Sequence, residues 1–276
     1  MRNQFKIIIF FIFTYNSVLA AKVEKITVYS KSMQKNTSAY VILPEKYQKD
    51  SNKKYPTLYL LHGFGGDYSS YPNDLPAVKK QADDYNMVII SADGGYSSWY
   101  FDSPIDPKIK YETYITKELI SYIDSSYSTI QNRTGRAICG LSMGGHGALY
   151  LSMRHSDLFG AAGSMSGGVD IRPFPKNWEI ASRLGGKDKF PLNWEKNTVI
   201  NQLDSIKDSI SFMIDCGTDD FFLEVNRQLH AKMLAKKIKH DYIERPGGHE
   251  MGYWKNAIKY QLLFFDIYFK EANLKQ

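Results

Sequence analysis

The sequence of 276 residues contains only two cysteines and no group of cysteines and histidines with the spacing of metal ligands. After the N-terminus it has no apolar run close to the roughly 20 residues that a membrane-spanning helix needs, and no motif recurs with a period of about 20–50 residues. We therefore expect neither a metal nor a cofactor, and we exclude a membrane bundle and a solenoid. What is present, 43% hydrophobic and 23% charged residues, is typical of a soluble globular protein.

The first twenty residues differ from the rest. Arg2 and Lys6 flank an apolar stretch at 7–13, and small residues follow at 18–20. This order is typical of a secretory signal peptide, whereas an anchor helix would need a longer apolar run. We expect residues 1–20 to be a leader, residues 21–276 to form the mature protein, and that protein to be secreted or periplasmic without stable membrane insertion.

The charge of the chain is mildly basic. Without the leader, 33 lysines and arginines stand against 29 aspartates and glutamates, a net charge of +4. The basic residues are mixed with acidic ones, and no stretch interleaves aromatic and basic residues as nucleic-acid modules do. We expect solvated charged faces and no nucleic-acid partner.

Short apolar runs alternate with segments of helical periodicity. Strands are expected at 25–30, 39–43, 57–62, 87–91, 136–139, 161–165, 211–215 and 241–245. Helices are expected at 75–85, 112–127, 144–154, 223–237 and 253–269. This alternation predicts one α/β domain with an eight-stranded, mostly parallel sheet, helices on both faces and an antiparallel hairpin at its start. The proline-rich and tryptophan-containing stretch at about 167–209 breaks the rhythm and is expected to be an insertion after the sixth strand.

A glycine-rich motif follows the fifth expected strand. Gly140-Leu141-Ser142-Met143-Gly144 has the pattern G-x-S-x-G between a strand and a helix. Glycines on both sides allow the sharp turn that holds a serine above the sheet at the positive end of a helix. Ser142 is therefore the expected nucleophile.

A serine needs a base and an orienting acid, and both can follow in chain order. Strand 241–245 leads into Gly247-Gly248-His249, which makes His249 the expected base. Strand 211–215 leads into a loop that contains Asp219 and Asp220, which compete for the role of the acid; Asp215, inside the strand, is a weaker candidate. Parallel strands bring all these loops to one edge of the sheet.

The turn after strand 57–62 reads His62-Gly63-Phe64-Gly65-Gly66. Backbone N–H groups in such a turn can stabilise an oxyanion, and we expect the donors to be Phe64 and Met143. A dinucleotide-binding loop also has the G-x-G pattern after a strand, but Tyr68 occupies the position of its third glycine.

The chain resembles the bacterial "putative esterase" family of α/β-hydrolases, which includes feruloyl and acetylxylan esterases of carbohydrate esterase family 1, tributyrin esterases, S-formylglutathione hydrolases and mycolyltransferases. The similar segments are YVILP (40–44), LHG (61–63), SWY (98–100), GLSMGG (140–145), FGA (159–161), SG (166–167), CGTDD (216–220), GH (248–249) and YW (253–254). The resemblance implies the α/β-hydrolase fold, and it selects Asp220 over Asp219 as the acid.

The resemblance also bears on the cysteines. It puts Cys139 and Cys216 on strands that are separated by a third, about 10 Å apart at roughly 4.8 Å per strand. A disulfide tolerates Cα separations of up to about 7 Å. We expect two buried free thiols.

Aromatic residues lie near the expected catalytic edge. We expect Trp99, Tyr100 and Tyr253 to bind substrate, because aromatic faces stack on sugar rings and phenolic acids. Trp178 and Trp194 fit the cleft and the core equally well.

The sequence thus predicts a secreted serine carboxylesterase that acts on a small acyl ester or an acylated carbohydrate, with feruloyl or acetyl esters of plant polysaccharide favoured. S-formylglutathione hydrolysis, acyl transfer to a sugar and non-catalytic carbohydrate binding are the alternatives. The sequence leaves the oligomeric state open.

Overall fold

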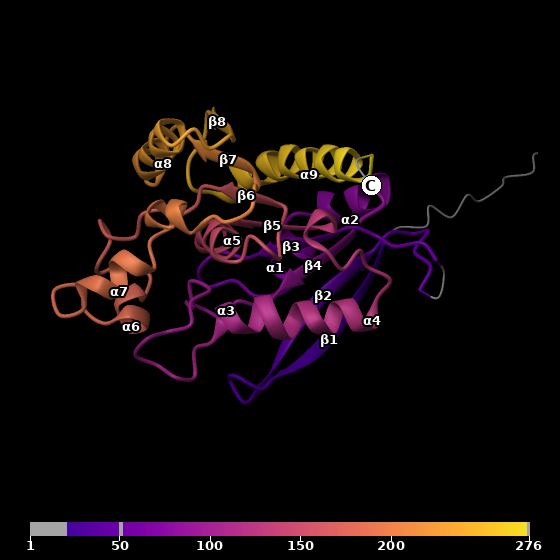
Figure 1. Cartoon of the computed structure of the whole chain (residues 1–276), viewed down its shortest axis with the longest axis horizontal. Coiled ribbons are helices and arrows are strands. Elements are labelled where there is room, and N and C mark those ends of the chain that lie inside the picture. The colour runs from indigo at the N-terminus through magenta and orange to yellow at the C-terminus, as the bar shows by residue number, and fades with distance from the viewer. Residues whose placement is uncertain (1–20, 50–51, 275–276) are drawn as a thin grey trace, which may run out of the picture.

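The computed structural model describes residues 21–49 and 52–274, so the expected leader lies outside the described residues. Eight strands form one sheet in the order β1-β2-β4-β3-β5-β6-β7-β8 (Figure 1). The strands are β1 (Lys22–Ser30), β2 (Lys35–Leu43), β3 (Thr57–Leu61), β4 (Val88–Ala92), β5 (Arg136–Leu141), β6 (Ala161–Met165), β7 (Ser211–Gly217) and β8 (Asp241–Arg245). β1 and β2 form an antiparallel hairpin, β2 pairs antiparallel with β4, and the remaining pairs are parallel. The predicted sheet and its entry hairpin are confirmed.

The helices follow the strands as predicted, with two local differences. They are α1 (Ser70–Asp74), α2 (Ala77–Asp84), α3 (Tyr111–Thr113), α4 (Ile120–Ser126), α5 (Met143–Arg154), α6 (Ile180–Leu184), α7 (Pro191–Lys196), α8 (Leu223–Ala235) and α9 (Met251–Asn273). The helix expected at 75–85 is observed as α2, which begins only after Pro76, because proline has no N–H to continue a hydrogen-bond ladder from the preceding residues; the short helix α1 before it was not predicted. The helix expected at 112–127 contains a π-helical turn, Tyr114–Leu119, between α3 and α4.

Side chains alternate between two cores, one on each face of the sheet. In β3, Leu58 and Leu60 pack with α2 and α9, whereas Tyr59 and Leu61 pack with α4, α5 and α8. Figure 1 shows α9 along one side of the sheet and α4 on the other. Because helices cover both faces, the central strands are apolar at nearly every position, which is why they read as continuous apolar runs.

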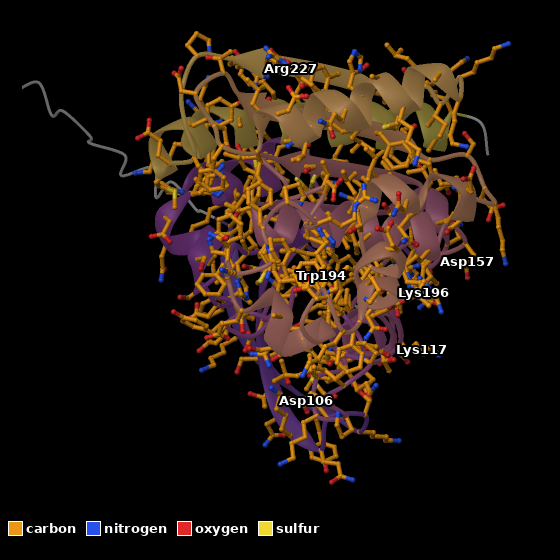
Figure 2. The ribbon with its side chains drawn as sticks, turned by 90° about the vertical axis from the view of Figure 1, so that its left-hand side faces the viewer. Asp106, Lys117, Asp157, Trp194, Lys196 and Arg227 are labelled. Atoms are coloured by element: carbon orange, nitrogen blue, oxygen red, sulfur yellow. The ribbon has the colours of Figure 1, made fainter. Side chains whose placement is uncertain are left out.

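The segment between β6 and β7 holds α6 and α7, which project to one side of the sheet (left in Figure 1). Trp194 anchors this segment: it is fully buried, and its indole N–H donates to Gly185 O at 2.9 Å. Figure 2 shows Trp194 in the middle of the side chains, whereas Lys117, Asp157 and Arg227 lie near the outline. The sequence was compatible with Trp194 in the cleft or in the core, and the structure places it in the core.

Cys139 lies on β5 and Cys216 on β7, with β6 between them. Both thiols are free and buried, as predicted. Burial raises the pKa of each thiol above its ordinary value. Within the described residues, no helix is both long enough and apolar enough to span a bilayer.

Candidate active site

Ser142 occupies a sharp turn between β5 and α5. Its backbone has φ 54° and ψ −117°, a conformation that costs a non-glycine residue about 1–3 kcal/mol. The flanking glycines are required by close approach: a Cβ on Gly144 would lie 1.9 Å from Leu61 O, and one on Gly140 would lie 2.1 Å from Gly144 O. The turn therefore closes only with these glycines, and it exposes the serine hydroxyl at the carboxyl end of the sheet.

His249 contacts this hydroxyl, and Asp220 contacts His249. Ser142 Oγ lies 2.8 Å from His249 Nε2, and His249 Nδ1 lies 2.9 Å from Asp220 Oδ2. An ionised carboxylate only accepts hydrogen bonds, so Nδ1 carries the ring proton and donates a hydrogen bond to Asp220, which leaves Nε2 free to accept a hydrogen bond from Ser142. The other oxygen of Asp220 accepts from the backbone N–H of Phe222 at 2.8 Å, which fixes the carboxylate.

The structure separates the three candidate acids. The Asp220 side chain is fully buried against His249, whereas Asp219 is exposed. Asp215 is also fully buried, but it accepts hydrogen bonds from Arg245 and from the Tyr253 hydroxyl. Of the three, Asp220 has the orienting geometry.

Aromatic rings enclose His249. Its centroid lies 4.2 Å from that of Phe221, 5.3 Å from that of Phe222 and 4.9 Å from that of Trp254. The imidazole keeps 14% of its side-chain exposure. Such surroundings strengthen the hydrogen bonds on either side of the ring, because few water molecules compete for them.

The turn after β3 lies beside Ser142, since a Cβ on Gly63 would be 3.4 Å from Ser142 Cβ. In this turn the N–H of Gly65 donates to Tyr96 O, and that of Gly66 donates to Gly63 O. The N–H groups of Phe64 and Met143, by contrast, have no acceptor within the described part of the chain. Both are therefore available to a substrate oxygen.

A pocket of about 320 Å³ contains Ser142 and His249. Its walls come from the 63–66 turn, from α1 with Leu75, from Trp178 and from the start of α9, which contributes Met251 and Trp254. Trp178, for which the sequence left core and cleft open, thus lies at the pocket.

The three residues expected to bind substrate do not line this pocket. Trp99, Tyr100 and Tyr253 are buried with 1%, 0% and 6% exposure. Their polar atoms are used internally, because the indole N–H of Trp99 donates to Trp178 O at 3.1 Å and the Tyr100 hydroxyl donates to His62 O at 3.0 Å. The Tyr253 hydroxyl donates to Asp215. The expectation for these three side chains is corrected: they pack in the hydrophobic cores and do not line this pocket.

The aromatic residues that do line the pocket are Phe64, Trp178 and Trp254. Sequence reasoning did not assign a substrate-binding role to Trp254. It follows Tyr253 directly, and successive helical residues point about 100° apart, so one is buried and the other faces the pocket. The residue at which α9 begins determines which of the two side chains faces the pocket. In the sequence, only the Gly247-Gly248 stretch indicated where that helix begins.

No group of three or more metal-binding side chains occurs among residues 21–49 and 52–274. His146, in the first turn of α5, is fully buried and stacks on Tyr150. Burial lowers the pKa of His146 to about 4, so it is neutral near pH 7.

The sheet, the strand-to-helix turn at Ser142 and the order of the acid and histidine define an α/β-hydrolase. A family model described as "Putative esterase" matches residues 30–265. The chain belongs to this esterase family and is a carboxylic ester hydrolase.

Individual relatives agree with this assignment. An acetyl esterase of Caldicellulosiruptor saccharolyticus is 30% identical over 258 residues, which cover 85% of this chain and 94% of that protein. The structure of a ferulic acid esterase is 30% identical, with a TM-score of 0.76 over 91% of this chain and 99% of the other. S-formylglutathione hydrolase of Staphylococcus aureus is 21% identical, with a TM-score of 0.77 over 89% and 99%, and shares the fold. The predicted fold and family are confirmed.

Proposed function

We propose that this protein is a secreted serine carboxylesterase that removes feruloyl or acetyl groups from plant polysaccharide. One observation carries the catalytic part: Ser142 Oγ, His249 and Asp220 form a continuous chain of hydrogen bonds with 2.8 Å and 2.9 Å between the paired atoms. The names of the acetyl esterase and the ferulic acid esterase support the acyl groups. Secretion rests on the leader-like composition of residues 1–20.

Acylation begins when His249 Nε2 takes the proton of Ser142 as its oxygen attacks the ester carbonyl. The carbonyl oxygen becomes an oxyanion, to which the N–H groups of Phe64 and Met143 donate. His249 then gives its proton to the alcohol oxygen, the bond from that oxygen to the carbonyl carbon breaks, and Ser142 keeps the acyl group.

Deacylation repeats these steps with water. His249 removes a proton from the water as it attacks the acyl-enzyme, and it returns the proton to Ser142 when the carboxylic acid leaves. Throughout, Asp220 holds the tautomer of His249 and stabilises the imidazolium that forms twice in each cycle.

The proposal is tested by turnover of methyl ferulate, acetylated xylan, tributyrin and S-formylglutathione by the purified mature protein. We expect cleavage of the first or second substrate to exceed that of the others in kcat/KM. Preference for S-formylglutathione would contradict the polysaccharide ester. Failure to cleave any of them, together with failure to cleave p-nitrophenyl acetate, would leave the carbohydrate-binding alternative.

Export is tested separately. We expect the protein expressed in its native host to be found outside the cytoplasm, with an N-terminus at Ala21 or Lys22. An intact Met1 in the cytoplasmic fraction would contradict secretion.

A further inference from the structure

A buried amide in the first turn of α8 contacts two loops of the site. The side chain of Asn226 is fully buried, and its Nδ2 lies 2.9 Å from Gly167 O and 2.9 Å from Phe222 O. Both neighbours are carbonyl oxygens, which only accept hydrogen bonds, so the NH2 group faces them and donates one hydrogen to each. The reaction described above assigns no role to this amide.

The first of these carbonyl groups belongs to the segment that holds the nucleophile. This segment, residues 165–168 at the end of β6, bonds twice to the backbone of Ser142. The N–H of Ser142 donates to Met165 O at 2.9 Å, and its O accepts from the N–H of Gly168 at 3.4 Å. Gly167 lies between these two contacts along the chain, so its position is coupled to that of the strained turn at Ser142.

The second carbonyl group belongs to the loop that holds the acid. The N–H of Phe222 donates to Asp220 Oδ1 at 2.8 Å, while its O accepts from Asn226. The loops that hold Ser142 and Asp220 are therefore both bonded to one amide group. His249 bridges the two side chains with 2.8 Å and 2.9 Å between the paired atoms, so its two hydrogen bonds depend on how far apart the loops lie.

The amide contributes little to the stability of the fold. Gly167 O also accepts from the N–H of Val169, and Phe222 O also accepts from the N–H of Asn226, so both oxygens keep a donor without the side chain. Asn226 Oδ1 is buried and has no hydrogen-bond partner among residues 21–49 and 52–274. Replacing such a group by an apolar side chain of similar shape is nearly neutral for stability. A buried polar group of this kind calls for an explanation other than stability.

We propose that Asn226 is a positioning residue that sets the spacing between Ser142 and Asp220 by donating one hydrogen bond to the loop of each. This inference rests on the proposed triad and goes beyond it, because Asn226 touches neither the substrate nor the reacting atoms. A displacement of about 1 Å at a catalytic group costs up to about 10²-fold in rate.

The test is Asn226→Leu, which removes both donors and keeps a branched side chain. We expect kcat for p-nitrophenyl acetate to fall by about 10–100-fold. KM should stay within about threefold, because acylation and deacylation both use His249 and Asn226 does not line the pocket. The melting temperature should change by no more than a few degrees. Asn226→Ala should lose as much turnover but melt at a lower temperature, because it leaves a cavity.

A double variant tests whether Asn226 acts through the triad. In Asp220→Asn the acid no longer orients the histidine, so adding Asn226→Leu should change kcat by less than about threefold, whereas independent effects would multiply. Gln261→Met is the matched control. Gln261 is a fully buried amide on α9 whose Nε2 contacts backbone oxygens within β6 and β7, at Ser164 and Met213, rather than the loops that follow these strands. This control should keep kcat within about threefold.

A loss of less than tenfold in both Asn226→Leu and Asn226→Ala would overturn the role of Asn226. Losses that follow the melting temperature, or that multiply with the loss in Asp220→Asn, would overturn it as well. Ser142→Ala separates this inference from the proposed function: full turnover in that variant would overturn the triad and the role of Asn226 together. If Ser142→Ala loses turnover while the Asn226 variants keep it, the triad stands and only the positioning role falls.

Discussion

Two buried carboxylates on one segment have different partners. Asp215 lies in β7 and accepts from Arg245 of β8 and Tyr253 of α9. Asp220, in the loop that follows, accepts from His249, whose other nitrogen contacts Ser142. Both side chains are fully buried. Burial alone therefore does not distinguish the two; their partners do.

The partners differ in how their charge behaves. Arg245 is permanently cationic, so Asp215 is neutralised in every state of the protein. In the proposed mechanism His249 gains its charge when it takes a proton from Ser142, so Asp220 would contribute most in the transition state. Asp215 is then expected to matter for stability and Asp220 for turnover.

The largest effect is expected from the replacement of Asp220, and it is an effect on turnover. Asp220→Asn keeps the volume of the side chain but lets the amide donate to His249, which favours the wrong tautomer. We expect kcat for p-nitrophenyl acetate to fall by about 10³–10⁴-fold. The melting temperature should stay within a few degrees of the wild-type value. Turnover within tenfold of wild type would show that another group orients His249.

Replacement of Asp215 is expected to act on stability. Asp215→Asn leaves the guanidinium of Arg245, which is 15% exposed, without its counter-charge. Breaking such a pair costs about 3 kcal/mol, or roughly 6–12 °C in melting temperature for a chain of this length. Calorimetry measures the shift, and kcat of the folded protein should stay within about tenfold. A stable variant that has lost its turnover would reverse the roles assigned to the two carboxylates.

Removal of the Tyr253 hydroxyl is also expected to lower the stability of the protein, but by less than the replacement of Asp215. Tyr253→Phe removes one of the donors to Asp215 and keeps the ring, so we expect a loss of about 1.5 kcal/mol. Thermal unfolding checks this value. KM for aryl esters should not change, because Tyr253 lies outside the pocket lining; a marked rise in KM would restore its expected role in substrate binding.

The last prediction concerns the reactivity of the buried thiols, and in particular that of Cys216, which directly follows Asp215. Since burial raises the pKa of both thiols, little thiolate exists at pH 8 in the folded protein. Titration with a disulfide reagent should detect no reactive thiol before unfolding and two afterwards. Rapid labelling of Cys216 in the native state would mean that the segment with the two carboxylates opens readily.

Much of this arrangement could be predicted from the sequence, because it depends on local patterns and chain order. Continuous apolar runs marked the strands, and the glycine motif marked the turn at Ser142. The order of the later loops brought His249 and the acid to the same edge of the sheet. The choice of Asp220 over Asp219 came from resemblance, since adjacent loop residues have no pattern to separate them.

The direction of individual aromatic side chains could not be predicted. Trp99 and Tyr100 have φ angles of 54° and 62°, and both side chains are buried with their polar atoms bonded inside the protein. Neither strand nor helix periodicity applies to such residues.

The central claim is that the hydroxyl of Ser142 is the nucleophile, activated by His249 and Asp220. It is tested most directly by reacting the protein with a fluorophosphonate and locating the adduct by peptide mass spectrometry. The account predicts one adduct on Ser142 Oγ, none in Ser142→Ala, and much slower labelling in Asp220→Asn. An adduct on a different residue, or equal labelling of the Ser142→Ala variant, would contradict it.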